Sequence, residues 1–185
     1  RDRGVRVAAV HPLLPFREPR AAAVAMRGAP AVVARGPGSR RLLDWFCETL
    51  GLEVLDVEIQ DRALYHAACA LAANGVTALL GLAVELLSAA GAVGAEPARR
   101  IATALAGAAS SAVAAAGASA ALTGPVRRGD VATVRAHLDA LRRPQVGPEA
   151  LAGYRVLMQL ALRLARDGGL TPERAAAIAA VLAAE

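Results

Sequence analysis

The sequence contains no lysine. All 21 of its basic residues are arginine, and they outweigh 16 acidic residues to give a formal net charge of +5 over 185 residues. Without a lysine amine, the chain can neither form a Schiff base nor use lysine as a general acid. The arginines are scattered, with no basic run longer than two residues and no aromatic residues interleaved, so we expect no nucleic-acid partner.

Cysteine, histidine and aromatic residues are also scarce. The two cysteines, Cys47 and Cys69, form no CxxC pair, and the three histidines are spread along the chain without metal-ligand spacing. We therefore expect free thiols, a cytoplasmic protein and no metal site. Aromatic residues make up only 3%, so alanine, leucine and valine must build the core, and 56% hydrophobic residues exclude global disorder.

A long apolar stretch without proline runs from Tyr65 to Gly91. It is apolar nearly all round, which predicts a buried helix. His66 and Asn74 lie on one face of that helix. Buried polar groups without partners cost about 1–3 kcal/mol each, so both must have internal partners or face a wet cleft. The stretch is long enough to span a membrane, but Asn74 and Glu85 would then lie in hydrocarbon, and we expect no membrane partner.

The pattern of the chain before this stretch is typical of an α/β structure. Apolar runs predict strands at 5–10, 31–34 and 53–59, the first as a buried strand of a parallel sheet. Ser39 and Gly51 mark the two ends of a predicted helix between the second and third strands. His11 and Pro12 follow the first strand, where ligands meet open α/β sheets. Three strands in about 60 residues make a poor independent domain, so we expect the end of a larger sheet.

From Asp61 onward the chain reads as all-helical. Helices are predicted at 61–90, 97–116, 130–141, 149–166 and from 172 to the end. The segment 118–129 is predicted to be a loop. In it, Thr123 with Arg127 or Arg128 could hold an anion, and Gly124 lets the backbone approach a ligand closely. The alternative is a plain connector between two helices.

Four blocks of sequence, in this order, resemble the Rossmann-like proteins that carry the helical domain of unknown function 2520. They are HPL with a following phenylalanine (residues 11–16), DRALYHAACALAAN (61–74), ALTGPVRRGD (121–130) and TVRAHLDAL (133–141). That family is similar to reductases of the 6-phosphogluconate-dehydrogenase type, such as ketopantoate reductase and pyrroline-5-carboxylate reductase. The resemblance covers almost the whole chain.

The resemblance implies an α+β chain in two parts. Residues 1–60 would be the C-terminal remnant of a Rossmann-like dinucleotide-binding domain, a partial α/β segment. Residues 61–185 would form an all-α helical domain like the C-terminal domain of 6-phosphogluconate dehydrogenase, used for substrate binding and dimerisation. The first half of the Rossmann domain, with its glycine-rich loop, would lie outside this sequence.

The resemblance also implies roles for individual residues. Polar residues of the first helix of the helical domain line the substrate cleft in the related reductases, which often use a lysine there as proton donor. Carried over, His66 is the expected proton donor, because histidine ordinarily titrates near neutral pH. Asn74 orients the substrate, and Tyr65 binds it. The substrate carboxylate is expected to bind to Thr123, Gly124, Arg127 and Arg128. The cofactor is expected to contact His11 and Pro12.

The function so implied is that of an NAD(P)-dependent oxidoreductase, a homodimer, that reduces a small keto or imino acid with NADP or NAD. This sequence alone would be inactive. The alternative is a non-catalytic helical module for dimerisation or ligand sensing on a degenerate Rossmann scaffold. The missing lysine and the alanine-rich face of the helix at 97–116 favour that alternative.

Overall fold

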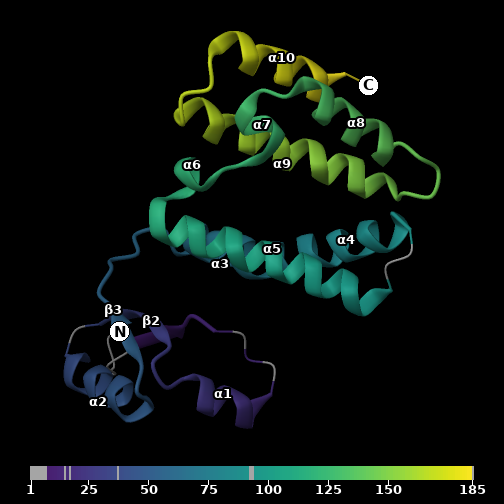
Figure 1. The fold of residues 1–185 in the computed structure, drawn as a ribbon. Coiled ribbons are helices and arrows are strands. Elements are labelled where there is room, and N and C mark those ends of the chain that lie inside the picture. Colours follow the sequence, from purple (N-terminus) through teal and green to yellow (C-terminus); the bar gives the residue numbers. More distant parts are fainter. Residues whose placement is uncertain (1–7, 15, 17, 37, 92–93, 185) are drawn as a thin grey trace. The chain divides into compact units, whose positions relative to one another are not determined.

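The computed structural model describes residues 8–14, 16, 18–36, 38–91 and 94–184 (Figure 1). The chain divides into two compact units, 1–75 and 76–185. The first holds a small three-stranded sheet, and the second is helical. The predicted α+β class, with a partial Rossmann-like segment and a helical domain, is therefore confirmed. The domain boundary expected after residue 60 stays a prediction.

The sheet has the order β1 (Ala8–Pro12), β2 (Pro30–Arg35), β3 (Glu53–Leu55). β2 and β3 are parallel, but β1 runs antiparallel to β2. The expectation that the first strand belongs to a parallel sheet is thus wrong, because an apolar run indicates burial and carries no information about strand direction. The predicted strand at 53–59 ends early, at Leu55. Residues 5–7 of the first predicted strand lie outside the described part.

The first unit also contains two helices. They are α1 (Pro19–Ala25) and α2 (Arg40–Leu50). Cys47 of α2 packs with β2 in a buried core cluster made of Ala29, Ala31, Val33, Cys47 and Leu52. Gly51 ends α2 with φ 66°, as predicted. Ser39 precedes α2 as predicted, but its hydroxyl donates a hydrogen bond to the Gly36 carbonyl (2.7 Å) and makes no side-chain cap.

The long apolar helix begins after Asp61, whose carboxylate accepts a hydrogen bond from the Leu64 amide (3.0 Å). It comprises α3 (Arg62–Ala70), a π-helical segment η1 (Leu71–Gly75) and α4 (Val76–Ala89). None of its residues is buried, so the prediction of a buried helix is wrong. Within the described ranges it is the one helix long and apolar enough to cross a membrane, with a mean hydropathy of 1.9. The apolar composition of a helix shows that burying its surface is favourable. It does not show that another part of the same chain covers that surface.

The helical unit contains a pair of long helices and a small bundle. α4 lies beside α5 (Ala95–Ala116) (Figure 1). The remaining helices are α6 (Ala118–Ala121), α7 (Gly124–Arg128), α8 (Val131–Leu141), α9 (Pro148–Asp167) and α10 (Pro172–Ala183). Their core includes Val126, Val134, Leu138, Leu162, Ile178 and Leu182. The predicted loop at 118–129 thus contains two short helices, because glycines with positive φ at Gly117, Gly124 and Gly129 divide the segment into separate turns.

Candidate functional site

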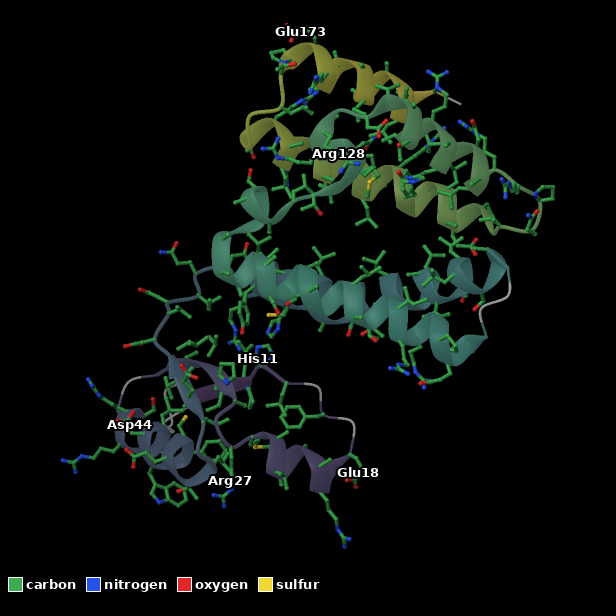
Figure 2. All side chains as sticks on the ribbon, in the orientation of Figure 1. His11, Glu18, Arg27, Asp44, Arg128 and Glu173 are labelled. Atoms are coloured by element: carbon green, nitrogen blue, oxygen red, sulfur yellow. The ribbon has the colours of Figure 1, made fainter. Side chains whose placement is uncertain are left out.

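The strands present two different faces. Ala31 and Val33 of β2 point toward the core shared with α2, so Val32 between them points to the opposite face. His11 of β1 lies directly across from Val32 in the antiparallel ladder. Directly opposed residues project to the same side. His11, labelled in Figure 2, therefore stands on the face of the sheet away from the α1 and α2 core.

A hydrogen bond connects His11 to the start of α3. The His11 Nδ1 atom and the Tyr65 hydroxyl oxygen are 2.6 Å apart, and the two rings meet edge to face with centroids 5.5 Å apart. Asp61 fixes the beginning of α3 and so positions Tyr65 one turn later. Desolvation raises the pKa of Tyr65, and hydrogen bonding to the Cys69 side chain adds to the rise. Tyr65 therefore keeps its proton at neutral pH.

His66 completes a cluster of three rings. Its centroid lies 5.5 Å from that of His11 and 5.3 Å from that of Tyr65. Tyr65 and His66 are neighbours in the sequence, but His11 comes from 54 residues before Tyr65. The structure thus brings together three of the predicted site residues, those expected to bind cofactor, bind substrate and donate the proton.

The three rings line a cavity of about 640 Å³ within the first unit. Its walls come from β1, β2, the segment 56–59 and the first turns of α3. This volume falls in the usual range for small-molecule sites, roughly 300–1,000 Å³. Three charged residues, Asp56, Glu58 and Arg62, also line it. Sequence reasoning gave none of these a role, although Arg62 precedes His66 by four residues on one helix and so shares its face.

Two predicted site residues lie elsewhere in the first unit. Pro12 lines a separate apolar cavity of about 490 Å³, on the side of the sheet that carries α1 and α2. Asn74 is exposed, lies in η1, and is not among the residues that line the 640 Å³ cavity. The expectation that Asn74 shares a face with His66 assumed 3.6 residues per turn, and the wider π-helical turn breaks that spacing.

The predicted carboxylate-binding residues belong to the helical unit. Thr123 is exposed and precedes α7, and Gly124 has φ 88°. The Arg127 guanidinium donates a hydrogen bond to the Gly168 carbonyl (2.7 Å), which ties α7 to the end of α9. Arg128 is exposed, and its carbonyl accepts a hydrogen bond from Arg174 (3.4 Å). Arg127 is thus engaged in holding the helices, whereas Thr123 and Arg128 leave their side chains toward solvent.

The described residues show no place for the whole of a nicotinamide dinucleotide. The rings of His11, Tyr65 and His66 line the cavity. The pyrophosphate needs a G-x-G-x-x-G turn between a strand and a helix. The turn between β2 and α2 has Gly36 and Gly38, but Arg41 occupies the place of the third glycine. Residues that would hold the pyrophosphate are therefore not found in the described part of the chain.

Comparisons with known proteins place the chain in a family. Residues 30–179 match the family described as domain of unknown function (DUF2520). The crystal structure of protein TM1727 from Thermotoga maritima has a similar fold, with a TM-score of 0.62 and 21% identity. The match covers 86% of this chain and 62% of that one, so this chain spans about three-fifths of the length of its structural relative. A search of proteins with curated functions gives no match. As the resemblance predicted, the chain belongs to the DUF2520 family.

Proposed function

We propose that this chain is part of an NAD(P)-dependent oxidoreductase that reduces a small keto or imino acid. The observation that carries the proposal is the cavity in which His11, Tyr65 and His66 meet beside Arg62. Such a site combines a volume suited to a small molecule with groups that bind an anion and hold protons. The family and the fold are compatible with this function and do not specify it.

Each residue of the cavity has a role in the proposal. The nicotinamide, when bound, supplies the hydride. His11, at the end of β1, lies against the ring of the cofactor, and Tyr65 contacts the substrate. His66 is the proton donor, because a histidine side chain exchanges protons readily near neutral pH. Substrate binding by Asn74 stays a prediction. The same holds for Thr123 and Arg128 of the helical unit.

We also propose that the protein is a cytoplasmic homodimer. The window of the apolar helix that could cross a membrane has no buried residues, and Leu64 and Leu71 are 68% and 74% exposed. On α5, Leu105 is 67% exposed. Soluble proteins rarely leave a large contiguous apolar surface uncovered. A second copy of this chain would cover it without placing Asn74 and Glu85 in hydrocarbon. Cys47 and Cys69 form no disulfide, which suits a reducing compartment.

Isothermal titration of the complete protein with NADPH and with NADH tests the enzyme proposal. We expect micromolar binding of one of them, and weaker binding to the 185-residue chain alone, because no turn that would hold the pyrophosphate is found in the described part of the chain. A screen of 2-keto acids and cyclic imines against the bound cofactor would follow. If the complete protein binds neither dinucleotide, the oxidoreductase proposal is wrong.

The second candidate is a non-catalytic module for dimerisation or ligand sensing. The exposed apolar helix favours it, since that surface needs a partner whether or not the cavity is an active site. Light scattering together with the dinucleotide titration separates the two candidates. A dimer that binds no dinucleotide supports the module, a dimer that binds one supports the enzyme, and a monomer at micromolar concentration contradicts the dimer in both.

A further inference from the structure

We infer that Tyr65 holds His11 in its Nε2–H tautomer, and that this Nε2–H group donates a hydrogen bond to the keto oxygen of a small 2-keto acid in the 640 Å³ cavity. The inference rests on the proposed function and narrows it, because it selects the keto acid over the imino acid. It adds a substrate contact to the cofactor contact proposed for His11. It follows from the length of one hydrogen bond, that between Tyr65 and His11.

The length of this hydrogen bond identifies its donor. The Tyr65 hydroxyl oxygen and the His11 Nδ1 atom are 2.6 Å apart. Hydroxyl donors form hydrogen bonds as short as about 2.5 Å, whereas bonds from N–H groups to oxygen begin at about 2.7 Å. The distance therefore fits a bond donated by Tyr65 and is too short for one donated by His11. A neutral imidazole carries one proton, so with Nδ1 as the acceptor this proton is on Nε2.

The neighbouring thiol of Cys69 supports the same direction. Cys69 lies one turn after Tyr65 on α3, and its side chain hydrogen-bonds with that of Tyr65. A thiol sulfur is a weak acceptor, and the unprotonated nitrogen of an imidazole is a better one. The tyrosine proton therefore goes to His11. Desolvation raises the pKa of Tyr65, so this proton is present throughout the neutral pH range.

The Nε2 atom of His11 is available to a ligand. The backbone of His11 is paired with Val32 in the sheet, and its side chain lines the cavity. Within the described ranges, Nδ1 makes the one hydrogen bond of this ring. The contact with Tyr65, and the packing of the His66 ring with its centroid 5.5 Å away, restrict rotation of the imidazole. The Nε2–H group is therefore a preorganised donor.

A neutral N–H donor in this place selects a ligand with an acceptor oxygen. A keto oxygen accepts the bond, whereas the nitrogen of a protonated imino acid has no lone pair and would oppose one donor to another, leaving both without a partner. His66, the proposed proton donor, is close enough for one small ligand to contact both rings. A hydrogen bond from His11 would also stabilise negative charge that develops on the oxygen that His66 protonates.

Nitrogen-15 NMR of the histidine side chains tests the tautomer. In the whole chain at about pH 8, where ordinary imidazoles are uncharged, His11 should carry its proton on Nε2 alone. His137 is the matched control, because its Nδ1 atom lies 2.9 Å from the Tyr154 hydroxyl, a length that fits either donor. Tyr65→Phe should let the Nδ1–H tautomer of His11 appear and leave His137 unchanged. A protonated Nδ1 on His11 in the parent chain would overturn the inference.

Three carboxylic acids of similar size test the ligand class. Pyruvate has a keto oxygen at carbon 2, propionate has a methylene group there, and L-alanine has an ammonium group. Pyruvate and propionate carry the same charge, so the comparison between them does not depend on the charges around the cavity. Binding to the whole chain is followed by NMR titration, with the resonances of His11 and His66 as reporters and that of His137 in the helical unit as the reference.

We expect pyruvate to bind about threefold to tenfold more tightly than propionate, the factor that corresponds to one neutral hydrogen bond. L-alanine should also bind more weakly than pyruvate. His11→Phe should abolish the preference for pyruvate over propionate, and His11→Gln, whose amide keeps an N–H donor, should retain part of it. The matched control Tyr154→Phe should keep the full preference. Circular dichroism verifies that the variants keep their helical content.

Several binding results would overturn the inference. Equal affinity for pyruvate and propionate, or a preference for pyruvate that persists in His11→Phe, would show that His11 does not bind the keto oxygen. Tighter binding of L-alanine than of pyruvate would select the imino acid. Absence of pyruvate binding would remove the cavity as a keto-acid site. Dinucleotide binding by the complete protein is measured separately, so failure of the keto-acid site and failure of the proposed function are distinguishable.

Discussion

The Tyr154 hydroxyl lies 2.9 Å from the Nδ1 atom of His137, and the two rings meet edge to face with centroids 5.8 Å apart. Both tyrosines of the chain thus pair with a histidine Nδ1, since Tyr65 makes the same contact with His11. The two pairs differ in their surroundings. Tyr65 and His11 line the cavity, whereas Tyr154 and His137 join α9 to α8. The second pair therefore serves as a control for the first.

Replacing each tyrosine by phenylalanine should separate structural from ligand-binding effects. Tyr65→Phe and Tyr154→Phe should each lower the free energy of unfolding by about 0.5–1.5 kcal/mol, the usual net worth of one hydrogen bond. Only Tyr65→Phe should also weaken dinucleotide binding by the complete protein, because it releases the His11 ring in the cavity wall. Urea denaturation and isothermal titration measure the two quantities. Equal effects of both variants on binding would contradict a role for Tyr65 in the site.

The lack of lysine makes the alkaline stability of the protein unusually simple to interpret. Burial raises the pKa of Tyr154, and desolvation with the Cys69 contact raises that of Tyr65. The folded state thus holds these protons more tightly than the unfolded state. The resulting stability is fully present below the ordinary tyrosine pKa of about 10 and is lost as the pH rises through the raised values.

We therefore expect the free energy of unfolding to fall as the pH rises above the ordinary tyrosine pKa of about 10, measured by urea denaturation at closely spaced pH values. The sequence has no lysine amines that would titrate in the same range as the tyrosines. The double variant Tyr65→Phe, Tyr154→Phe should flatten the curve above pH 10. An unchanged slope in that variant would show that other groups cause the loss.

Arg127 and Arg128 are adjacent but should respond differently to substitution. Arg127→Ala removes the donor to the Gly168 carbonyl (2.7 Å) and should cost about 1.5–3 kcal/mol of unfolding free energy, as expected for a hydrogen bond from a charged group. Arg128→Ala changes an exposed side chain and should stay within about 0.5 kcal/mol of the parent. Thermal or urea denaturation measures both. Equal losses would show that Arg127 does not hold the end of α9.

Two glycines with positive φ allow steric and conformational costs to be separated. Gly129 has φ 68°, and a Cβ atom there would lie 2.9 Å from the Arg174 Cβ. Gly169 has φ 93° and nothing within 4 Å of the same position. Gly169→Ala should cost about 1–2 kcal/mol from backbone strain alone. Gly129→Ala should cost clearly more in the same denaturation assay, and equal costs would mean that Arg174 moves aside freely.

The apolar helix provides a direct test of the dimer. Leu71 on this helix and Val24 on α1 are both 74% exposed. If a second copy covers the helix, Leu71→Gln should shift the monomer–dimer equilibrium toward monomer, and Val24→Gln should leave it unchanged, as measured by sedimentation velocity. If the protein remains dimeric in Leu71→Gln, another surface forms the interface. Partition of the wild-type chain into lipid vesicles would indicate a membrane partner instead.

Local signals in the sequence predicted the helix ends well. The helices predicted to begin at 61, 130 and 172 do begin there, after Asp61, Asp130 and Thr171, whose side chains accept backbone hydrogen bonds. Such capping depends only on residues within one turn. The antiparallel direction of β1 and the exposure of the helix from Arg62 to Ala89 were not predicted. Both features depend on contacts with residues that are distant in the sequence or do not belong to it.

The site was predictable only in part, for the same reason. Tyr65 and His66 follow from the resemblance, but their contact with His11 depends on how the sheet meets α3. The π-helical turn that displaces Asn74 has no signal in the apolar pattern, which continues through it unbroken. Arg62 became a candidate only when the structure placed it in the lining of the same cavity as His66.

The short strand β3 has a consequence for handling the protein in solution. In the described part of the chain it pairs with β2 alone, so its other edge carries unpaired backbone groups, and Val54 and Leu55 are each 37% exposed. Such an edge is a template for strand addition by another molecule. Concentrated samples of this chain should therefore form aggregates rich in β structure, and the net charge of +5 should restrain this only at low ionic strength, where repulsion between copies is least screened.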